Sequence, residues 1–247
     1  MSKIVDRTLD CLEIFADQKQ PLSITEVAKI LGIAASSCRD VLKALERRGY
    51  VYEVTPRGGF YPTLRMLELG KTTAAYDPVL TRAESLLRSL RDMLDESVQL
   101  AKVSDLQATY LLAFESSQPL RMITSVGNNL RSLHATSAGK ALLAALDERT
   151  FERYMKSVKM TPLTEKSIKS KQELRQQIAT GRKCGWFVNR EESVEGVTTL
   201  ASQFRWRESL YLVSIAGPTA RIDAKLDMAA QMLLDVCRRL EMRGAPE

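Results

Sequence analysis

A row of hydroxyl and cationic side chains between residues 36 and 47 carries the clearest chemistry in this sequence of 247 residues. In a helix over about residues 35–48, the row lies opposite an apolar stripe. The stripe consists of Cys38, Val41, Leu42 and Leu45. Small serines let a helix backbone approach the major groove, and Arg and Lys reach base edges or phosphates. We therefore expect contacts to double-stranded DNA from Ser36, Ser37, Arg39, Lys43 and Arg47.

The flanking segments favour a winged helix-turn-helix over residues 1–70. Ser23 and Glu26 form a capping-box pattern at the start of a short helix that Gly32 ends, and residues 4–16 give a further amphipathic helix. Residues 50–61 indicate a hairpin whose turn places Arg57 at the tip, where a wing meets the DNA backbone or minor groove. The alternatives are a charged helix face that is only solvated and a helix-turn-helix that binds protein.

A second group of small polar residues lies near expected strand ends and at one helix start. It comprises Thr136 to Gly139, Asn189, Thr198 and Thr199, and Ser214 with Ala216 to Pro218. A helix N-terminus with free N–H groups is a natural place for a carboxylate, and neighbouring hydroxyls and amides would complete a pocket for a small acid. Close packing of a helix on a sheet explains the same small residues without a ligand.

Catalytic and metal-binding patterns are not found. Residues 137–140 resemble the end of a phosphate loop, but His134 stands where its first Gly is needed and Ala141 where Ser or Thr is needed. His134 is the only histidine, which excludes metal sites built on several imidazoles. The acidic cluster of Glu191, Glu192 and Glu195 is expected to be solvated. We expect no catalytic residue, no metal and no cofactor; the rival hypothesis is an enzyme that modifies a metabolite in the C-terminal pocket, with the N-terminal module serving protein interaction.

The rest of the chain predicts an α+β fold, an antiparallel sheet with helices on its face. Strands are expected over residues 98–103, 109–114, 122–126, 186–189, 198–204 and 209–216, and helices over 137–146, 170–184 and 221–243. Asp77 and Pro78 are typical of a helix start. The helix from there to residue 97 carries a 3.5-residue apolar period, which predicts either a dimeric coiled coil or packing on its own domain. The expected divisions are residues 1–70, a linker helix at 71–97 and a second domain at 98–247.

Charge and cysteine content give weaker guidance. The net charge is +6, but residues 1–75 hold 11 Lys and Arg against 9 Asp and Glu, so most of the excess lies outside the expected DNA reader. The four cysteines are scattered, without metal-ligand spacing, as in a cytoplasmic protein with reduced thiols. No apolar run approaches the roughly 18 residues of a membrane span, so we expect no membrane contact.

Five segments of the chain, taken in order, resemble the IclR family of bacterial transcriptional regulators. They are VDRTLDCLEIFADQKQPLSITEVAKILGIAASSCRDVLKALERRGYV, YPTLRMLELG, LRSLHATSAGKALLAAL, GWFVNREESVEGVTTLA and VSIAGPTARI. The resemblance implies a winged helix-turn-helix, a linker helix and a GAF-like effector domain, assembled as a homodimer or homotetramer on a DNA operator. It also implies effector contacts at Ser137, Ala138, Asn189, Thr199, Ser214 and Ala216.

The chain departs from the family pattern at three of these positions and at Asp40 in the expected recognition helix. Asn189 stands where the family often has an acidic residue, and Thr199 where Cys is known. Ala216 replaces the second Ser of an SxSGP pattern, and Asp40 stands where Arg is common. Lost or added hydroxyls and acids change which effector oxygens and which bases find a partner. The effector and the operator therefore depend on residues particular to this chain, and repression and activation both fit the motifs.

Overall fold

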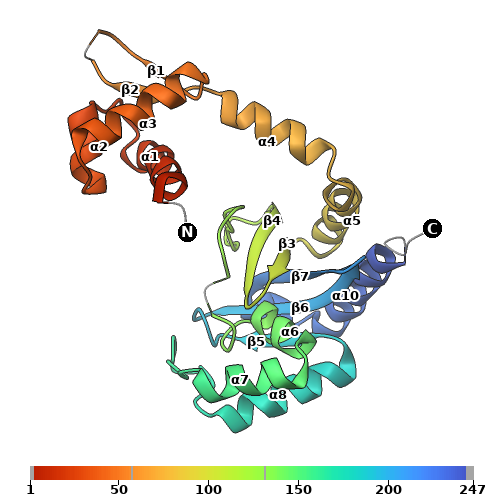
Figure 1. The fold of residues 1–247 in the computed structure, drawn as a ribbon. Coiled ribbons are helices and arrows are strands. Elements are labelled where there is room, and N and C mark those ends of the chain that lie inside the picture. The colour runs from red at the N-terminus through yellow and green to blue at the C-terminus, as the bar shows by residue number, and fades with distance from the viewer. Residues whose placement is uncertain (1–2, 57, 131, 243–247) are drawn as a thin grey trace. The chain divides into compact units, whose positions relative to one another are not determined.

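The computed structural model describes residues 3–56, 58–130 and 132–242 and divides the chain into two compact units between residues 76 and 77 (Figure 1). The N-terminal unit contains α1 (Lys3–Gln18), α2 (Ile24–Leu31), α3 (Ala35–Arg47), β1 (Val51–Glu53), β2 (Phe60–Pro62) and α4 (Arg65–Ala75). Its core joins the apolar faces of the first three helices to the hairpin and includes Phe15, Val27, Leu42 and Phe60. The expected winged helix-turn-helix is confirmed.

Local capping explains where α2 begins and ends. The Ser23 hydroxyl accepts a hydrogen bond from the Glu26 N–H at 3.3 Å, and the Glu26 carboxylate accepts from the Ser23 N–H at 2.7 Å. Gly32 ends the helix at φ 63°, a left-handed conformation that favours glycine. The chain then turns directly into α3, so the two helices are held at a fixed angle by the turn and by their shared core.

The wing is a short antiparallel hairpin in which Tyr52 lies opposite Tyr61. Gly59 has φ 96°, and a Cβ there would lie 2.9 Å from the backbone of Leu22, so the return strand needs a glycine at this point. After the wing, α4 continues through residues 71–75, which fall in the expected linker helix. The Thr73 hydroxyl bonds back to Leu69 O at 2.9 Å, and Lys71 pairs with Glu68 at 3.0 Å.

The C-terminal unit is a five-stranded antiparallel sheet in the order β4-β3-β7-β6-β5. The strands are β3 (Ser97–Ser104), β4 (Gln107–Phe114), β5 (Phe187–Arg190), β6 (Val197–Trp206) and β7 (Ser209–Pro218). The helices are α5 (Pro78–Leu94), α6 (Ser137–Ala145), α7 (Glu148–Ser157), α8 (Lys171–Cys184), α9 (Thr219–Asp223) and α10 (Leu226–Glu241). The predicted α+β class with an antiparallel sheet is confirmed.

Helices lie on both faces of the sheet (Figure 1), and each face carries an apolar layer. On one face, Val98, Leu200 and Ile215 pack with α5 and α10. On the other face, the small residues Ala101 and Ala201 pack with α6. Alternate residues of a strand point to opposite faces, so every second residue of β3, β6 and β7 points to the face that carries α6. This small-residue face is where a cavity forms.

The apolar stripe of α5 packs within its own unit. Asp77 caps the helix by accepting from the N–H groups of Val79 and Leu80 at 2.8 and 3.0 Å, and Pro78 stands in the first turn, as predicted. Five stripe residues are buried against the sheet and α10: Val79, Ala83, Leu87, Leu90 and Leu94. Most of the stripe therefore packs on its own domain, as the second alternative predicted, while Met93 stays exposed.

Two predicted elements differ in the C-terminal unit. The predicted strand over residues 122–126 is wrong: the chain is irregular there, and residues 127–130 pair with the free edge of β4 instead, with Leu130 N–H donating to Ala108 O at 2.7 Å. The predicted helix over residues 221–243 is broken into α9 and α10. Lys225 leaves the helical conformation at the break and reaches the buried Glu96 carboxylate at 3.0 Å.

Candidate nucleic-acid interface and ligand cavity

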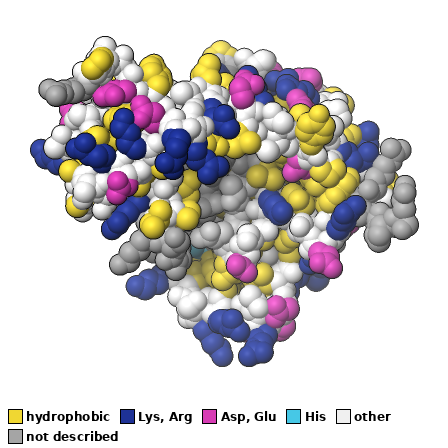
Figure 2. Space-filling view, turned by 45° about the horizontal axis from the view of Figure 1, so that its top comes forward, with side chains coloured by type: hydrophobic (Ala, Val, Ile, Leu, Met, Phe, Trp, Pro, Cys, Tyr) yellow, Lys and Arg dark blue, Asp and Glu magenta, His cyan; other side chains and the backbone are white. Residues whose placement is uncertain are grey.

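The outward face of α3 is open to solvent. Ser36, Arg39, Asp40, Lys43 and Arg47 are exposed, whereas Ser37 is half-buried. The opposite face buries Cys38, Leu42 and Leu45, as the stripe predicted. Figure 2 shows Lys and Arg side chains gathered on the N-terminal unit at the upper left, with a few acidic side chains among them. The structure thus brings five of the six predicted DNA contacts onto one helix; Arg57 lies outside the described residues.

Two features of α3 bear on anion binding. Its N-cap residue is Ala34, which provides no side-chain hydrogen bond, so the first N–H groups of the helix remain available to an anion. Lys43 donates to Glu46 at 2.8 Å and lies 5.3 Å from the centre of the Phe60 ring. The hydrogen bond to Glu46 raises the pKa of Lys43, so its ammonium stays charged. Lys43 therefore sits between the helix and the wing.

A cavity of about 690 Å³ opens beside the N-terminus of α6. Five of the six residues predicted to contact an effector line it: Ser137, Ala138, Thr199, Ser214 and Ala216. They come from α6, β6 and β7, and register explains their meeting, because Thr199 lies directly opposite Ala216 across the β6–β7 pair. Asn189, the sixth predicted residue, does not line this cavity.

The start of α6 presents hydrogen-bond donors to the cavity. Thr136 caps the helix and its hydroxyl accepts from the Gly139 N–H at 3.1 Å, which leaves the N–H groups of Ser137 and Ala138 without an intrahelical partner. The Ser137 and Thr199 hydroxyls lie 2.7 Å apart. A Cβ on Gly139 would lie 2.4 Å from the backbone of Leu133, so glycine is required for α6 to approach this segment.

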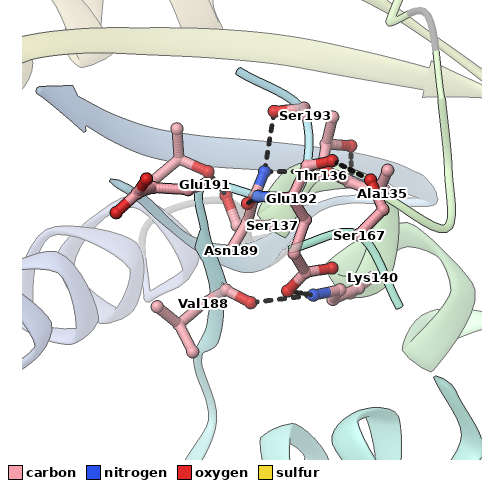
Figure 3. A network of polar contacts seen from close by, with 12 residues as sticks. Ala135, Thr136, Ser137, Lys140, Ser167, Val188, Asn189, Glu191, Glu192 and Ser193 are labelled. Atoms are coloured by element: carbon pink, nitrogen blue, oxygen red, sulfur yellow. Dashed lines mark hydrogen bonds and ion pairs between the residues drawn. The ribbon is translucent and has the colours of Figure 1, made fainter. Parts of the chain in front are cut away.

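Asn189 does not face the cavity but forms hydrogen bonds to segments that line it. Its side chain is fully buried, and its amide nitrogen donates to Ala135 O at 2.7 Å and to the Ser193 hydroxyl at 2.8 Å (Figure 3). Its amide oxygen accepts from the Glu192 N–H at 2.7 Å. Ser193 lines the cavity and Ala135 leads into α6. Asn189 therefore ties two cavity segments together instead of facing the ligand space.

A buried ion pair lies next to Asn189. The Lys140 ammonium donates to Val188 O at 3.0 Å and to Glu192 at 2.5 Å (Figure 3). Burial lowers the pKa of Lys140 and raises the pKa of Glu192, while their mutual attraction opposes both changes. The expectation that residues 191, 192 and 195 form a solvated acidic cluster is thus wrong for Glu192, whose carboxylate is withdrawn to meet Lys140 inside the unit.

Several residues that line the cavity were not predicted from the sequence. Gln99, Tyr110, Asn129 and Ser193 provide polar groups, and Met122, Ile123, Leu130, Leu163 and Val194 provide apolar walls. Gln99 had one available signal, since it is a polar residue flanked by apolar ones in a strand with both faces covered. Tyr110 lies on β4, and the remaining residues lie in irregular segments, which carry no periodicity from which to place them.

Two further findings concern metal ions and membranes. In residues 3–56, 58–130 and 132–242, no three His, Cys, Asp or Glu side chains gather into a group that would hold a metal ion. Within the same ranges, no helix combines the length and apolar character that a bilayer crossing demands.

Known proteins match nearly the whole chain. The model of the bacterial transcriptional regulator IclR C-terminal region matches residues 72–242, and the IclR helix-turn-helix model matches residues 4–55. The chain is 25% identical to the HTH-type transcriptional regulator XynR of Escherichia coli (strain K12), covering 89% of this chain and 87% of XynR. It is 27% identical to the acetate operon repressor of Salmonella typhimurium, covering 96% of this chain and 88% of that protein.

A solved structure extends the likeness to the fold. The crystal structure of an IclR homolog complexed with 4-hydroxybenzoate, from Microbacterium hydrocarbonoxydans, matches with a TM-score of 0.80 at 17% identity, covering 97% of this chain and 98% of that chain. Both family models describe transcriptional regulators, and this match decides between the regulator hypothesis and the enzyme hypothesis. The chain belongs to the IclR family of bacterial transcriptional regulators, with a helix-turn-helix DNA-binding domain followed by an effector-binding domain, and it is not an enzyme.

Proposed function

We propose that this regulator reads a double-stranded DNA operator with the outward face of α3 and with Arg57 at the wing, and that a small carboxylic acid in the C-terminal cavity alters this binding. The observation that carries the proposal is the exposed row on α3, with serines at the start of the helix and cations along it. Ser36 and Ser37 allow close approach, and Arg39, Lys43 and Arg47 meet base edges or phosphates. The uncapped N-terminus of α3 favours a phosphate at the same place.

The lining of the cavity supports a carboxylic acid as the effector class. Hydroxyl donors from Ser137 and Thr199 and the free N–H groups of α6 face one region, and a carboxylate accepts from several donors at once. A cavity of about 690 Å³ with apolar walls has room for a hydrocarbon body larger than two or three carbons. The related protein from Microbacterium was crystallised with 4-hydroxybenzoate, an aromatic acid of this kind.

Communication between the sites needs a defined path along the chain. We assign DNA reading to residues 1–70, connection to residues 71–97 and GAF-like effector binding to residues 98–247. The connecting segment includes α5, whose C-terminus joins β3 beside Ser97, and the Ser97 hydroxyl donates to Met122 O at 2.7 Å. Met122 lines the cavity, so an effector would bear on the end of α5. A coupling on the order of 1–3 kcal/mol is sufficient for regulation.

The proposal includes a homodimer or homotetramer acting in the cytoplasm. Two copies are needed to read two half-sites one helical turn apart. Within its unit, α4 buries none of its residues and exposes Met66, Leu67 and Leu69, and Leu64 is exposed just before it. Such a helix gains stability when a second copy covers its apolar side. We therefore place the contact between readers on α4.

Selection from a random pool of duplex DNA tests the proposal. The full-length protein is immobilised at low salt, bound duplexes are amplified over several rounds, and recovered sequences are compared. We expect enrichment of a two-fold symmetric site whose half-sites are spaced by about 10 base pairs or a multiple. The recovered duplex is then titrated with and without the carboxylic acid that most raises the protein's melting temperature. Failure to enrich any sequence would remove the DNA-reading proposal; enrichment with no response to a bound acid would remove only the effector proposal.

A further inference from the structure

Gln99 stands out among the cavity residues because it is buried yet only partly hydrogen bonded. Its side chain is 4% exposed, and it lies on β3 directly opposite Ser214 on β7. The Ser214 hydroxyl donates to the Gln99 amide oxygen at 2.8 Å. Among the described residues, the amide nitrogen of Gln99 has no hydrogen-bond partner. This nitrogen is not one of the described side-chain atoms that are both fully enclosed and unpartnered, so its two N–H donors are open to a ligand or water in the cavity that Gln99 lines.

The hydrogen bond from Ser214 shows which end of the amide faces the cavity in this structure. A glutamine amide presents an acceptor or a donor after a half-turn about its last bond. With the oxygen held by the Ser214 hydroxyl, the NH₂ group is the end left for a ligand. Gln99 and Ser214 both line the cavity, so this donor group lies in the same space as the Ser137 and Thr199 hydroxyls.

The sheet register makes this cluster a continuous polar surface. Gln99, Ser214 and Ala201 form one row across β3, β7 and β6, and Ser97, Ala216 and Thr199 form the next row on the same face. Ala216 lines the cavity and leaves open space beside the polar side chains, whereas Ala201 packs in the core beside α6. An oxygen placed over Ala216 would meet the Gln99 nitrogen from one side and the α6 N-terminus from the other.

We propose that Gln99 is the specificity-determining residue of the effector site: its amide NH₂, oriented by Ser214, donates to an oxygen of the effector's carboxylate. This proposal rests on the proposed function, since it assumes that the cavity takes a carboxylic acid. In this arrangement a neutral amide, a helix N-terminus and hydroxyl groups together recognise the negative charge of the effector. Ser214 is a positioning residue that acts through Gln99.

Binding of matched ligands to variants tests the assignment. Isothermal titration of the full-length protein uses benzoate, hexanoate and 4-hydroxybenzoate, together with benzamide, benzylamine and hexylamine. Gln99→Glu keeps the size of the side chain but replaces the donor with a carboxylate, so we expect carboxylate affinity to fall by about 100-fold or more and amine affinity to rise. Gln99→Leu, which introduces no charge, should weaken carboxylate binding about 10-fold and leave amine binding unchanged.

Ser214→Ala separates positioning from simple packing. Without the serine hydroxyl the Gln99 amide rotates freely, so the preference for benzoate over benzamide should shrink several-fold, whereas a purely structural loss would weaken both ligands alike. Ser202→Ala is the matched control, because Ser202 is equally buried on β6 but donates to Gly185 O away from the cavity.

The outcomes distinguish the two levels of the proposal. If wild-type protein binds a carboxylate and Gln99→Glu binds it equally well, the assignment of Gln99 is wrong and the carboxylic-acid site stands. If wild-type protein binds none of the carboxylates, or prefers the amines, both the effector class and the role of Gln99 are overturned. Retained binding of selected duplex DNA by the variants shows that they are folded.

Discussion

The ammonium group of Lys140 lies 2.5 Å from the carboxylate of Glu192, and both side chains are almost completely buried. A buried ion pair seldom adds net stability, because two charges lose their hydration. This pair instead joins α6 to the segment that follows β5, and each of these carries residues of the effector cavity. The geometry of the cavity therefore depends on charges that the ligand does not touch.

Removing one member of this pair should destabilise the C-terminal unit strongly. Lys140→Met leaves Glu192 as an uncompensated buried charge, so we expect a loss of about 3–5 kcal/mol in the free energy of unfolding. Lys140→Met combined with Glu192→Leu should recover most of that loss, since an apolar pair needs no charge compensation. Urea denaturation of the full-length protein measures both. Lys166→Met is the control, because Lys166 is exposed and its pair with the partly buried Glu191 is worth no more than about 1 kcal/mol. Equal effects of the two single variants would show that the Lys140–Glu192 pair has no special role.

Asp95 should make one loop contact sensitive to acid. It follows α5 at φ 49°, and its carboxylate accepts from Gln118 and from the Ser117 hydroxyl and N–H. These hydrogen bonds lower the pKa of Asp95 to about 2 from the usual 3.8. A depressed pKa means that the stabilisation is fully present above about pH 4 and is lost as the pH falls toward 2. The protection factor of the Ser117 amide, the ratio of its intrinsic to its observed exchange rate, should therefore fall over that range.

Asp95→Asn provides the comparison for this pH effect. Asparagine tolerates the left-handed conformation but carries no ionisable group, so exchange at Ser117 should be faster than in the wild type at pH 5 and should lack the carboxylate's contribution between pH 4 and 2. Identical pH profiles in the two proteins would show that Asp95 does not hold this loop.

Asp40 should weaken general DNA affinity and sharpen sequence preference. It is exposed on α3 among the expected DNA contacts, where its charge repels phosphates but its oxygens accept from cytosine N4. Asp40→Ala should strengthen binding to unrelated duplex DNA several-fold and reduce the ratio of selected-site to unrelated-site affinity. Fluorescence anisotropy with both duplexes measures the ratio. Asp17→Ala removes one negative charge from α1 as the control, and the same change of ratio in both variants would leave Asp40 without a role at the bases.

Acidic residues on the apolar side of α4 should dissociate the proposed dimer into monomers. Met66 and Leu69 are one helical turn apart and exposed, so Met66→Glu with Leu69→Glu should shift sedimentation toward the monomer and weaken binding to a two-half-site duplex at least 10-fold. Lys71→Glu places a like charge on the other side of the helix as the control. Unchanged sedimentation of the double variant would place the contact elsewhere.

Local signals account for what the sequence predicted well. The Ser23 and Glu26 capping box, the Asp77 and Pro78 start and the glycine that ends α2 each act within four residues, so the sequence contains both partners. The exposed side of α3 followed from its 3.6-residue period. The packing partner of α5 could not be predicted in this way, because the same stripe suits a second copy or α10 equally. The choice between them depends on contacts with residues far away in sequence.

The cavity shows the same division. The start of α6 was predictable, and it positions Ser137 and Ala138 as expected. Gln99 was not, because its role depends on register with Ser214, which lies 115 residues away along the chain. Asn189 was predicted at the ligand, but it meets three backbone and hydroxyl groups instead and is thereby fully buried. A residue's presence near a site was thus easier to predict than the direction its side chain takes.

The salt dependence of DNA binding is the decisive measurement of whether α3 contacts DNA phosphates. A duplex recovered by selection is titrated with wild-type protein and with a triple variant carrying Arg39→Ala, Lys43→Ala and Arg47→Ala, over a range of salt concentrations. We predict that the slope of log affinity against log salt falls by about 2 to 3 in the triple variant, as expected when that many phosphate contacts are lost. Replacing Arg149, Arg153 and Lys156 on α7 with Ala should leave the slope nearly unchanged. Equal slopes for wild type and the α3 variant, or a loss confined to the α7 variant, would contradict the claim that α3 lies on DNA.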